Sequence, residues 1–424
     1  MATAPIGFSR VLPGTERPGH GPVHRAMHET RNPIPADPAD PSKPFVGLTM
    51  PEAESAFHNF QKSAQEFKDF ACLGHRPIVD GEAKDYAWFT YEQIYSRVSH
   101  FGSGLMHRKL MPSTGDGRMV GVYMKNSLDW IVAEQAAYMF SAVVVALYDT
   151  LGAESTEYIL NQTELTTIIC TVTELKKLIQ LRAKCPHLRN IVVCGASDNE
   201  AESAATAAEL NVFHYNVIES EGQANLLSPV PPIASSIATL MYTSGTTGEP
   251  KGVELTHSSF MSSCAGTFDF LASGGVVFST DTVHLCYLPL AHIYERAAQV
   301  SVFNRGGRVG FSQNNPLKIL DDLRALRPTL FCGVPRLLNR IYDQIAAKMA
   351  AAPKIPSYLF ATALSIKVKR FTKFGAVEHA FWDRLFFKKV AESLGLDRCQ
   401  LMFSGSAPLA PDVLNFCRVV FMTR

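Results

Sequence analysis

The sequence lacks both the cysteine pattern of a metal or disulfide protein and a strong net charge. No CxxC pair occurs, and the nine cysteines are scattered from Cys72 to Cys417. An odd, unpaired set argues against a disulfide framework or a zinc site and favours a reducing compartment, with most cysteines in the core. The 40 Lys and Arg residues nearly balance the 39 Asp and Glu residues, for a net charge of +1. We therefore expect no nucleic-acid partner.

Long hydrophobic runs are absent as well. Residues 1–22 carry Pro, Gly and Arg where a secretory signal needs a continuous apolar stretch, and Ala2 stands where myristoylation needs glycine. The most apolar stretch, 130–148, is interrupted by Glu134 and Gln135. Its composition predicts a buried helix followed by a buried strand instead of a membrane span. An intracellular protein is expected.

What the chain does contain is a regular alternation of apolar runs and amphipathic stretches between Thr90 and Gly195. This alternation is typical of an α/β fold in which helices flank mixed or parallel sheets. The spacing predicts strands at 119–123, 142–147, 166–171 and 190–194, and helices at 127–138, 154–162 and 174–184.

With 424 residues the chain exceeds a usual single core, so we expect more than one domain or subdomain. Residues 1–45 are rich in Pro and Asp and predict an extended or disordered segment. The small, acidic run 197–210 and the prolines at 229–232 predict a surface insertion and a boundary. This gives a first α/β subdomain at 46–235 and a second, incomplete at its C-terminus, at 236–424.

The most informative segment is TLMYTSGTTGEPKGVELTH, residues 239–257, where an apolar strand runs into a loop closed by a lysine. Glycines allow close backbone approach to a ligand, hydroxyls donate hydrogen bonds, and the lysine adds a cation, which together favour phosphate. A Walker-type loop is disfavoured, because Pro250 stands where that motif requires a glycine and Gly252 stands where it requires a metal-binding hydroxyl. A chance polar turn explains this composition poorly. The candidate phosphate ligands are Thr243, Ser244, Gly245, Thr246, Thr247, Gly248 and Lys251, with Gly252 beside them.

The core of this segment, YTSGTTGEPKG, resembles the AMP-binding signature of the adenylate-forming superfamily. The resemblance implies the large N-terminal domain of such an enzyme, with ATP, Mg²⁺ and coenzyme A as cofactors or co-substrates. It implies that the loop holds the ATP phosphates while a carboxylate attacks the α-phosphate, giving an acyl-adenylate and pyrophosphate. Charge neutralisation at the phosphorus is the physical need. Thr243 and Lys251 are the implied catalytic residues.

The segment YLPLAHIYERA, residues 287–297, is similar to the corresponding motif of long-chain acyl-CoA synthetases, which implies a fatty acid substrate. By composition it predicts a buried strand end at 287–290. The resemblance favours a substrate-pocket role for His292. A core histidine bonded to the backbone is the alternative, and a local Glu295–Arg296 ion pair is the alternative to a functional Glu295.

Two later segments resemble the same family. FCGVPRLLNRIYDQI, residues 331–345, implies a place for Val334 at the acyl pocket. Arg336 after Pro335 is better explained as a surface residue at a helix start. LMFSGSAPLAP, residues 401–411, implies an adenine-binding turn, although a plain strand-to-helix turn has the same composition. Leu337, Leu338, Ile341 and Ile345 have the spacing of core residues, and the turn consists of Gly405, Ser406, Ala407 and Pro408.

The sequence after Phe421 shows no Tyr-Gly-x-Thr-Glu segment, ribose-binding Asp or C-terminal lid lysine, which the family has. We therefore expect that the C-terminal lid domain is absent and that the complete parent enzyme activates a long-chain fatty acid to acyl-CoA. The alternatives are a non-catalytic protein that binds nucleotide or acyl chains, and a ligase for another carboxylic acid. The family is compatible with a peroxisomal or endoplasmic-reticulum surface and with a peripheral membrane contact.

Overall fold

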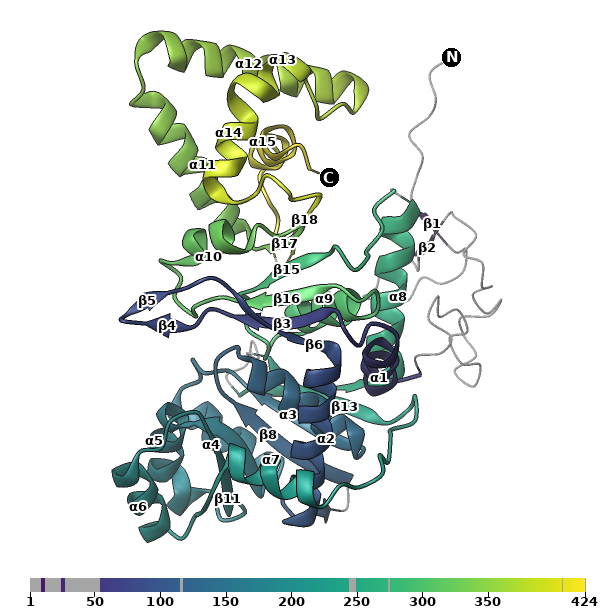
Figure 1. Ribbon diagram of the computed structural model, residues 1–424, viewed down its shortest axis with the longest axis vertical. Helices are drawn as coiled ribbons and strands as arrows, with labels where there is room; N and C mark the ends of the chain where they lie inside the picture. The colour runs from purple at the N-terminus through teal and green to yellow at the C-terminus, as the bar shows by residue number, and fades with distance from the viewer. Residues whose placement is uncertain are drawn as a thin grey trace.

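The computed structural model describes residues 9–11, 24–26, 54–114, 117–243, 249–273, 275–405 and 407–423. Two large β-sheets, each flanked by helices, make up its body, and a group of helices extends beyond the second sheet (Figure 1). The predicted α/β class is confirmed. Within residues 1–45 the described part is a short antiparallel pair, β1 (Ser9–Val11) and β2 (His24–Ala26).

The first sheet has the strand order β12-β11-β10-β8-β9-β13-β14, with β7 paired to β8. The strands from β12 to β13 are parallel, and β14 is antiparallel to β13. All six residues of β9 are buried, because helices cover both faces of the sheet. The strands are β7 (Ser113–Thr114), β8 (Gly117–Tyr123), β9 (Ala142–Leu147), β10 (Thr167–Thr171), β11 (Asn190–Cys194), β12 (Asn211–His214), β13 (Ile237–Thr243) and β14 (Lys251–Thr256).

The helices around this sheet confirm the predicted alternation within a few residues. The apolar stretch 130–148 is a buried helix followed by a buried strand, as predicted, since α3 is buried along nearly its whole length. The helices are α1 (Ala56–Glu66), α2 (Tyr91–His107), α3 (Leu128–Met139), α4 (Ala153–Gln162), α5 (Val172–Leu181), the short η1 (Arg182–Lys184), α6 (Asn199–Ala207) and α7 (Tyr215–Ala224).

The prediction of a surface insertion at 197–210 is wrong. Residues from this run form α6, which Asp198 caps by accepting a hydrogen bond from the Ala201 N–H. Ala201 and Ala205 are buried, and β12 follows as the next parallel strand. The small side chains are therefore what lets α6 pack closely beside α5 and β12.

The second sheet has the order β18-β17-β15-β16-β3-β6, parallel except for β6 against β3. The division of the chain at residue 235 stays a prediction, and hydrogen-bonded strands from both sides of it share each sheet. The strands, with the separate β4–β5 hairpin, are β3 (Ala71–His75), β4 (Ile78–Val79), β5 (Glu82–Ala83), β6 (Ala87–Thr90), β15 (Val283–Cys286), β16 (Arg308–Phe311), β17 (Leu330–Gly333) and β18 (Leu401–Ser404).

The helices of the second half include a group, α11 to α15, that lies at the end of the molecule beyond the second sheet (Figure 1). The four apolar residues predicted for the core of α11 are all buried there. Among the described residues, no helix has the length and apolar character needed to cross a bilayer. The helices are α8 (His257–Ser273), α9 (Ile293–Phe303), α10 (Ile319–Leu326), α11 (Pro335–Ala350), α12 (Lys354–Phe374), α13 (Ala380–Trp382), the π-helical η2 (Asp383–Phe387), α14 (Lys388–Leu394) and α15 (Pro411–Phe421).

Candidate functional site

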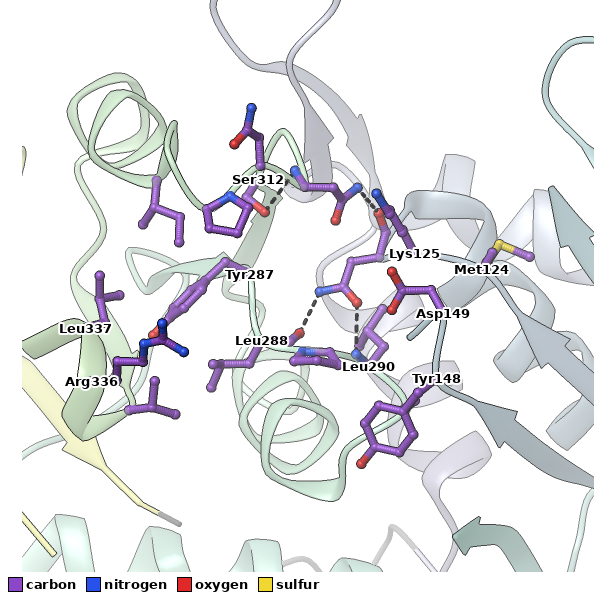
Figure 2. A pocket seen from close by; sticks show the side chains of 18 of the residues that line it. Met124, Lys125, Tyr148, Asp149, Tyr287, Leu288, Leu290, Ser312, Arg336 and Leu337 are labelled. Atoms are coloured by element: carbon purple, nitrogen blue, oxygen red, sulfur yellow. Dashed lines mark hydrogen bonds between the residues drawn. The ribbon is translucent and has the colours of Figure 1, made fainter. Parts of the chain in front are cut away.

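A pocket of about 590 Å³ lies where parallel strands of both sheets end (Figure 2). Its walls follow the carboxyl ends of β8, β9, β15, β16 and β17, the edge at which α/β proteins form ligand crevices. Its volume is in the range of small-molecule sites. Residues 287–290, which were predicted as the end of a buried strand, come directly after β15 and form one wall. The lining comprises 124–126, 147–149, 287–291, 312, 314–316, 319, 334, 336–337 and 340.

Asn126 joins the pocket walls that come from the two sheets. Its buried amide donates to the Leu288 carbonyl at 2.6 Å and accepts from the Leu290 N–H at 2.8 Å. The Asn314 amide in turn donates to the Asn126 carbonyl at 2.9 Å (Figure 2). Asn126, in the segment that follows β8, thereby fixes the segments that follow β15 and β16. Nothing in the sequence signalled this role, because its partners lie far along the chain.

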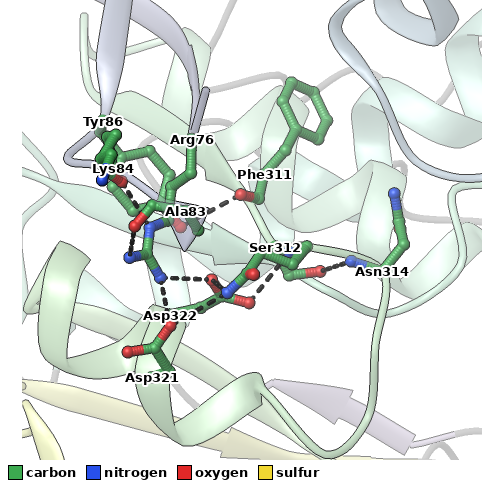
Figure 3. Close-up of polar contacts among 10 residues, drawn as sticks. Arg76, Ala83, Lys84, Tyr86, Phe311, Ser312, Asn314, Asp321 and Asp322 are labelled. Atoms are coloured by element: carbon green, nitrogen blue, oxygen red, sulfur yellow. Dashed lines mark hydrogen bonds and ion pairs between the residues drawn. The ribbon is translucent and has the colours of Figure 1, made fainter. Parts of the chain in front are cut away.

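A second polar cluster supports the segment after β16 (Figure 3). The Arg76 guanidinium contacts Asp321 at 2.7 Å and Asp322 at 3.0 Å. The Gln313 N–H donates to the buried Asp322 carboxylate at 2.9 Å. The hydrogen bond from Arg76 also lowers the pKa of Asp321. These contacts tie the lining residues 312–316 to α10 and to the segment after β3.

The two ends of the predicted phosphate loop lie side by side. Thr243 ends β13 and Lys251 begins β14, and they are paired residues of this antiparallel hairpin. Both are exposed, so their side chains are available to a ligand. Since β13 runs parallel to β9, Thr243 emerges at the same sheet edge as Tyr148, which lines the pocket. Residues 244–248 of the loop lie outside the described residues.

Gly252 has a reason of its own in this hairpin. The Tyr242 ring lies over it, and a Cβ atom at this position would approach that ring to 3.1 Å. The Tyr242 hydroxyl donates to the Gln162 Oε1 at 2.7 Å. The glycine therefore allows an aromatic ring to anchor the base of the loop, which is a closer approach than a side chain would permit.

His292 is the N-cap of α9. Its Nδ1 accepts a hydrogen bond from the Tyr294 N–H at 3.1 Å, and the side chain is exposed. A buried core histidine is thus the wrong alternative, although the backbone bond is present. His292 follows directly after the lining residue Ala291 but does not itself line the pocket among the described residues. Its substrate role stays a prediction.

Val334 lines the pocket as the N-cap residue of α11, with Pro335 at the first helical position. Arg336 is exposed, as predicted for a helix-start residue, and it also lines the pocket with Arg340 one turn later. These two cations and Lys125 share the pocket with one carboxylate, Asp149, and with both apolar and uncharged polar side chains (Figure 2). Such a pocket suits an apolar molecule that carries an anionic group.

The predicted adenine-binding turn follows β18 and lies next to the start of α9. A Cβ atom added at Gly405 would lie 3.3 Å from the Tyr294 ring. Ala407 and Pro408 are exposed, whereas Ser406 lies outside the described residues. The turn therefore lies near Tyr294 in the first turn of α9, and His292 is the N-cap of the same helix. Both lie at the N-terminal end of α9.

The alternative of a local Glu295–Arg296 ion pair is wrong, because the two side chains have separate buried partners. Glu295 Oε1 lies 2.7 Å from His284 Nε2. Arg296 instead pairs with Glu134 of α3 and donates to the Thr239 hydroxyl at 2.9 Å. Consecutive residues of a helix point in different directions, which explains the separation. Both side chains thereby link α9 to neighbouring elements, and a functional role for Glu295 stays a prediction.

His257 should make stability depend on pH. It is buried beside Arg296, and burial, then the charge of Arg296, lowers its pKa to about 3. The unfolded chain protonates this imidazole near pH 6.5, so the unfolded state binds more protons between about pH 6.5 and 3. The free energy of unfolding should fall as the pH decreases through this window.

Urea unfolding of the protein and of His257→Gln at several pH values tests this. The variant should lose up to one proton's worth of slope, about 1.4 kcal/mol per pH unit. Equal slopes in both proteins between pH 6 and 4 would contradict the assignment.

Metal and thiol chemistry find little support in the described part of the chain. It holds no group of three or more His, Cys, Asp and Glu side chains able to bind a metal. Magnesium binding therefore stays a prediction. All nine cysteines are free and buried, which confirms their expected place in the core.

Comparison with known proteins supports the resemblance over most of the chain. The family model described as AMP-binding enzyme matches residues 60–424. Long chain acyl-CoA synthetase 6, peroxisomal, from Arabidopsis thaliana is 36% identical over 98% of this chain and 56% of its own length. Long-chain-fatty-acid–CoA ligase 5 from Rattus norvegicus is 33% identical over 87% of this chain and 53% of its own length. The chain thus spans about half the length of these relatives.

Solved structures agree on the fold. The adenylation domain of a carboxylate reductase from Mycobacterium chelonae has a TM-score of 0.69 at 18% identity, over 87% of this chain and 56% of that one. The corresponding domain from Segniliparus rugosus, determined with AMP and a co-purified carboxylic acid, has a TM-score of 0.68 at 18% identity, over 87% and 59%. Together with the family match, these findings establish that the chain belongs to the AMP-binding enzyme family.

Proposed function

We propose that the chain carries the nucleotide-handling part of a long-chain fatty acid–CoA ligase. In the first step a carboxylate oxygen attacks the α-phosphorus of ATP, the bond to the β-phosphate oxygen breaks, and pyrophosphate leaves. In the second step the thiol of coenzyme A attacks the acyl carbon, loses its proton and displaces AMP. The thioester is acyl-CoA.

The observation that carries this proposal is the pairing of Thr243 with Lys251, with Thr243 at the same sheet edge as the pocket residue Tyr148. An exposed cation and hydroxyl beside each other at strand ends can hold a phosphate chain and offset the charge that develops at phosphorus. The loop between them, 244–248, carries the remaining proposed phosphate ligands. The turn at 405–408 would hold the adenine, and His292 would border the substrate.

The pocket between the two sheets supports an acid with a long apolar tail. Leu147, Leu288 and Leu337 are among its apolar wall residues, and Arg336 with Arg340 can attract a carboxylate. The relatives named above support the same substrate class. Two relatives from Arabidopsis thaliana are named as peroxisomal, which supports a peroxisomal location as part of the proposal.

The test is the exchange of labelled pyrophosphate into ATP, with Mg²⁺ present and palmitate, octanoate or benzoate as the acid. We expect palmitate to support the fastest exchange, with palmitoyl-adenylate detected by mass spectrometry. Adding coenzyme A then tests the second step through palmitoyl-CoA. Faster exchange with benzoate would assign another carboxylic acid. ATP binding without exchange by any acid would instead assign a non-catalytic nucleotide-binding protein.

A further inference from the structure

The pocket at the strand ends carries more positive charge than one fatty acid carboxylate can offset. In the described part of its wall the charged residues are the cations Lys125, Arg336 and Arg340 and the carboxylate Asp149, an excess of two positive charges. None of these four side chains has an ion-pair or hydrogen-bond partner among the described residues. Uncompensated cations in a concave site attract an anionic ligand.

The two arginines share one face of α11, because they are one helical turn apart. Both are exposed, so their guanidinium groups are open to a ligand. Figure 2 shows Arg336 on one side of the pocket and Lys125 with Asp149 on the opposite side. The Asp149 carboxylate therefore does not neutralise the arginines, and an anion beside α11 meets two groups that bind oxyanions through paired N–H donors.

The first turn of α11 adds backbone donors to the same wall. Its N-cap is Val334, whose side chain has no oxygen to accept a hydrogen bond from the helix N–H groups. The Arg336 N–H lies in the first turn, where the helix itself offers no acceptor. Val334, Arg336 and Leu337 all line the pocket, so the positive end of this helix faces it and reinforces the charge of the arginines.

The Tyr287 hydroxyl is a further donor beside the arginines. It is buried and has no hydrogen-bond partner among the described residues. Its ring stacks on the Phe331 ring, with 5.6 Å between the ring centres, and extends toward Arg336 (Figure 2). A buried hydroxyl without a partner is costly, so we expect a ligand atom that accepts its hydrogen bond.

We propose that Arg336, Arg340 and the Tyr287 hydroxyl form a product site for pyrophosphate, with Lys125 adding attraction from the opposite wall. Pyrophosphate carries several negative charges and phosphate oxygens at both ends, which matches this number of donors better than one carboxylate does. The pocket lies at the sheet edge where Thr243 ends β13, beside the proposed place of phosphate transfer. The inference rests on the proposed function, because that reaction releases pyrophosphate.

The site acts after the bond between the α-phosphorus and the β-phosphate oxygen has broken, so no covalent step takes place in it. Pyrophosphate that moves to α11 is separated from the acyl-adenylate, and its attack on the α-phosphorus in the reverse direction becomes slower. The arginines first attract the acid and then bind the leaving product, since both are anions.

Pyrophosphate binding is measured by calorimetric titration without ATP or acid. Lys251→Ala serves as the background, because it weakens any binding by the phosphate loop. In this background, Arg336→Gln combined with Arg340→Gln should weaken pyrophosphate binding by at least about tenfold, a modest value because the side chains are exposed. The matched control, Lys369→Gln combined with Lys373→Gln, removes two exposed cations one turn apart on α12 and should bind like the background.

Tyr287→Phe separates binding from folding. Since the hydroxyl has no partner in the protein, its removal should leave the free energy of unfolding unchanged or higher. Pyrophosphate binding should nevertheless weaken by about three- to tenfold. Circular dichroism verifies that all variants are folded.

Pyrophosphate exchange in the Lys251 parent background gives a kinetic readout. Arg336→Gln combined with Arg340→Gln should raise KM for pyrophosphate and leave KM for ATP unchanged. Unchanged pyrophosphate binding in this double variant would overturn the proposal. Weaker binding of coenzyme A alone would assign its diphosphate instead, and weaker binding of palmitate alone would assign a carboxylate site. Loss of exchange with retained pyrophosphate binding would contradict the ligase proposal and not the diphosphate site.

Discussion

Lys251→Ala should reduce acid-dependent pyrophosphate exchange by about 10²- to 10³-fold, the typical effect of removing one donor that stabilises transition-state charge. Lys251 is the first residue of β14, pairs with Thr243 and is exposed. Its loss leaves the loop backbone intact but removes the only cation in the described part of the hairpin loop, 249–251. Exchange rates at saturating palmitate measure the effect.

Lys68→Ala is the matched control, since Lys68 is also exposed but follows α1 away from the pocket. It should exchange pyrophosphate at the parent rate. Calorimetric titration with ATP adds a second readout, and the Lys251 variant should bind ATP more weakly by about 10- to 100-fold. Parent-like exchange and affinity in Lys251→Ala would remove this residue from the proposed mechanism.

Arg296→Met should lower the free energy of unfolding by about 3–5 kcal/mol, because it leaves the Glu134 carboxylate buried without its cation. Arg296 is fully enclosed, with its guanidinium 5.4 Å from the centre of the Trp130 ring. Through Glu134 and Thr239 it connects α9 with α3 and β13. Urea unfolding followed by circular dichroism measures the change.

The second substitution in the same pair distinguishes a lost charge partner from lost packing. Glu134→Gln combined with Arg296→Met removes both charges and should recover a large part of the stability. Arg305→Met, at an exposed arginine just beyond α9, should change the free energy of unfolding by less than about 1 kcal/mol. If Arg296→Met is as stable as Arg305→Met, the buried pair is unimportant for folding.

Local pattern was enough to predict much of the fold. The elements between Thr90 and Gly195 follow hydrophobic periodicity, and β9 has the predicted bounds 142–147. Periodicity failed at 197–210, where the alanines of α6 gave too weak an apolar signal to reveal a packed helix. The motifs that led to Thr243, Lys251 and Val334 were likewise local, since each residue lies at the end or start of a strand or directly after one.

Contacts between distant segments could not be predicted in this way. Asn126 reaches residues 288 and 314, and Arg296 reaches Glu134, so neither pairing leaves a mark in neighbouring sequence. The same limit explains the wrong Glu295–Arg296 ion pair, since adjacency in the chain suggested a contact that helix geometry prevents. Single-sequence reasoning identifies the strand ends that form a site but not what holds them together.

The second sheet combines strands from early and late parts of the chain, so it cannot be completed until late in synthesis. The strands β3 and β6 leave the ribosome early, but their partner β16 begins only at Arg308. Until then β3 has an unpaired edge that must remain soluble while the whole first sheet is made. The nascent chain should therefore need chaperone protection longest at residues 71–90, and a chain that stalls before Arg308 should aggregate through this edge.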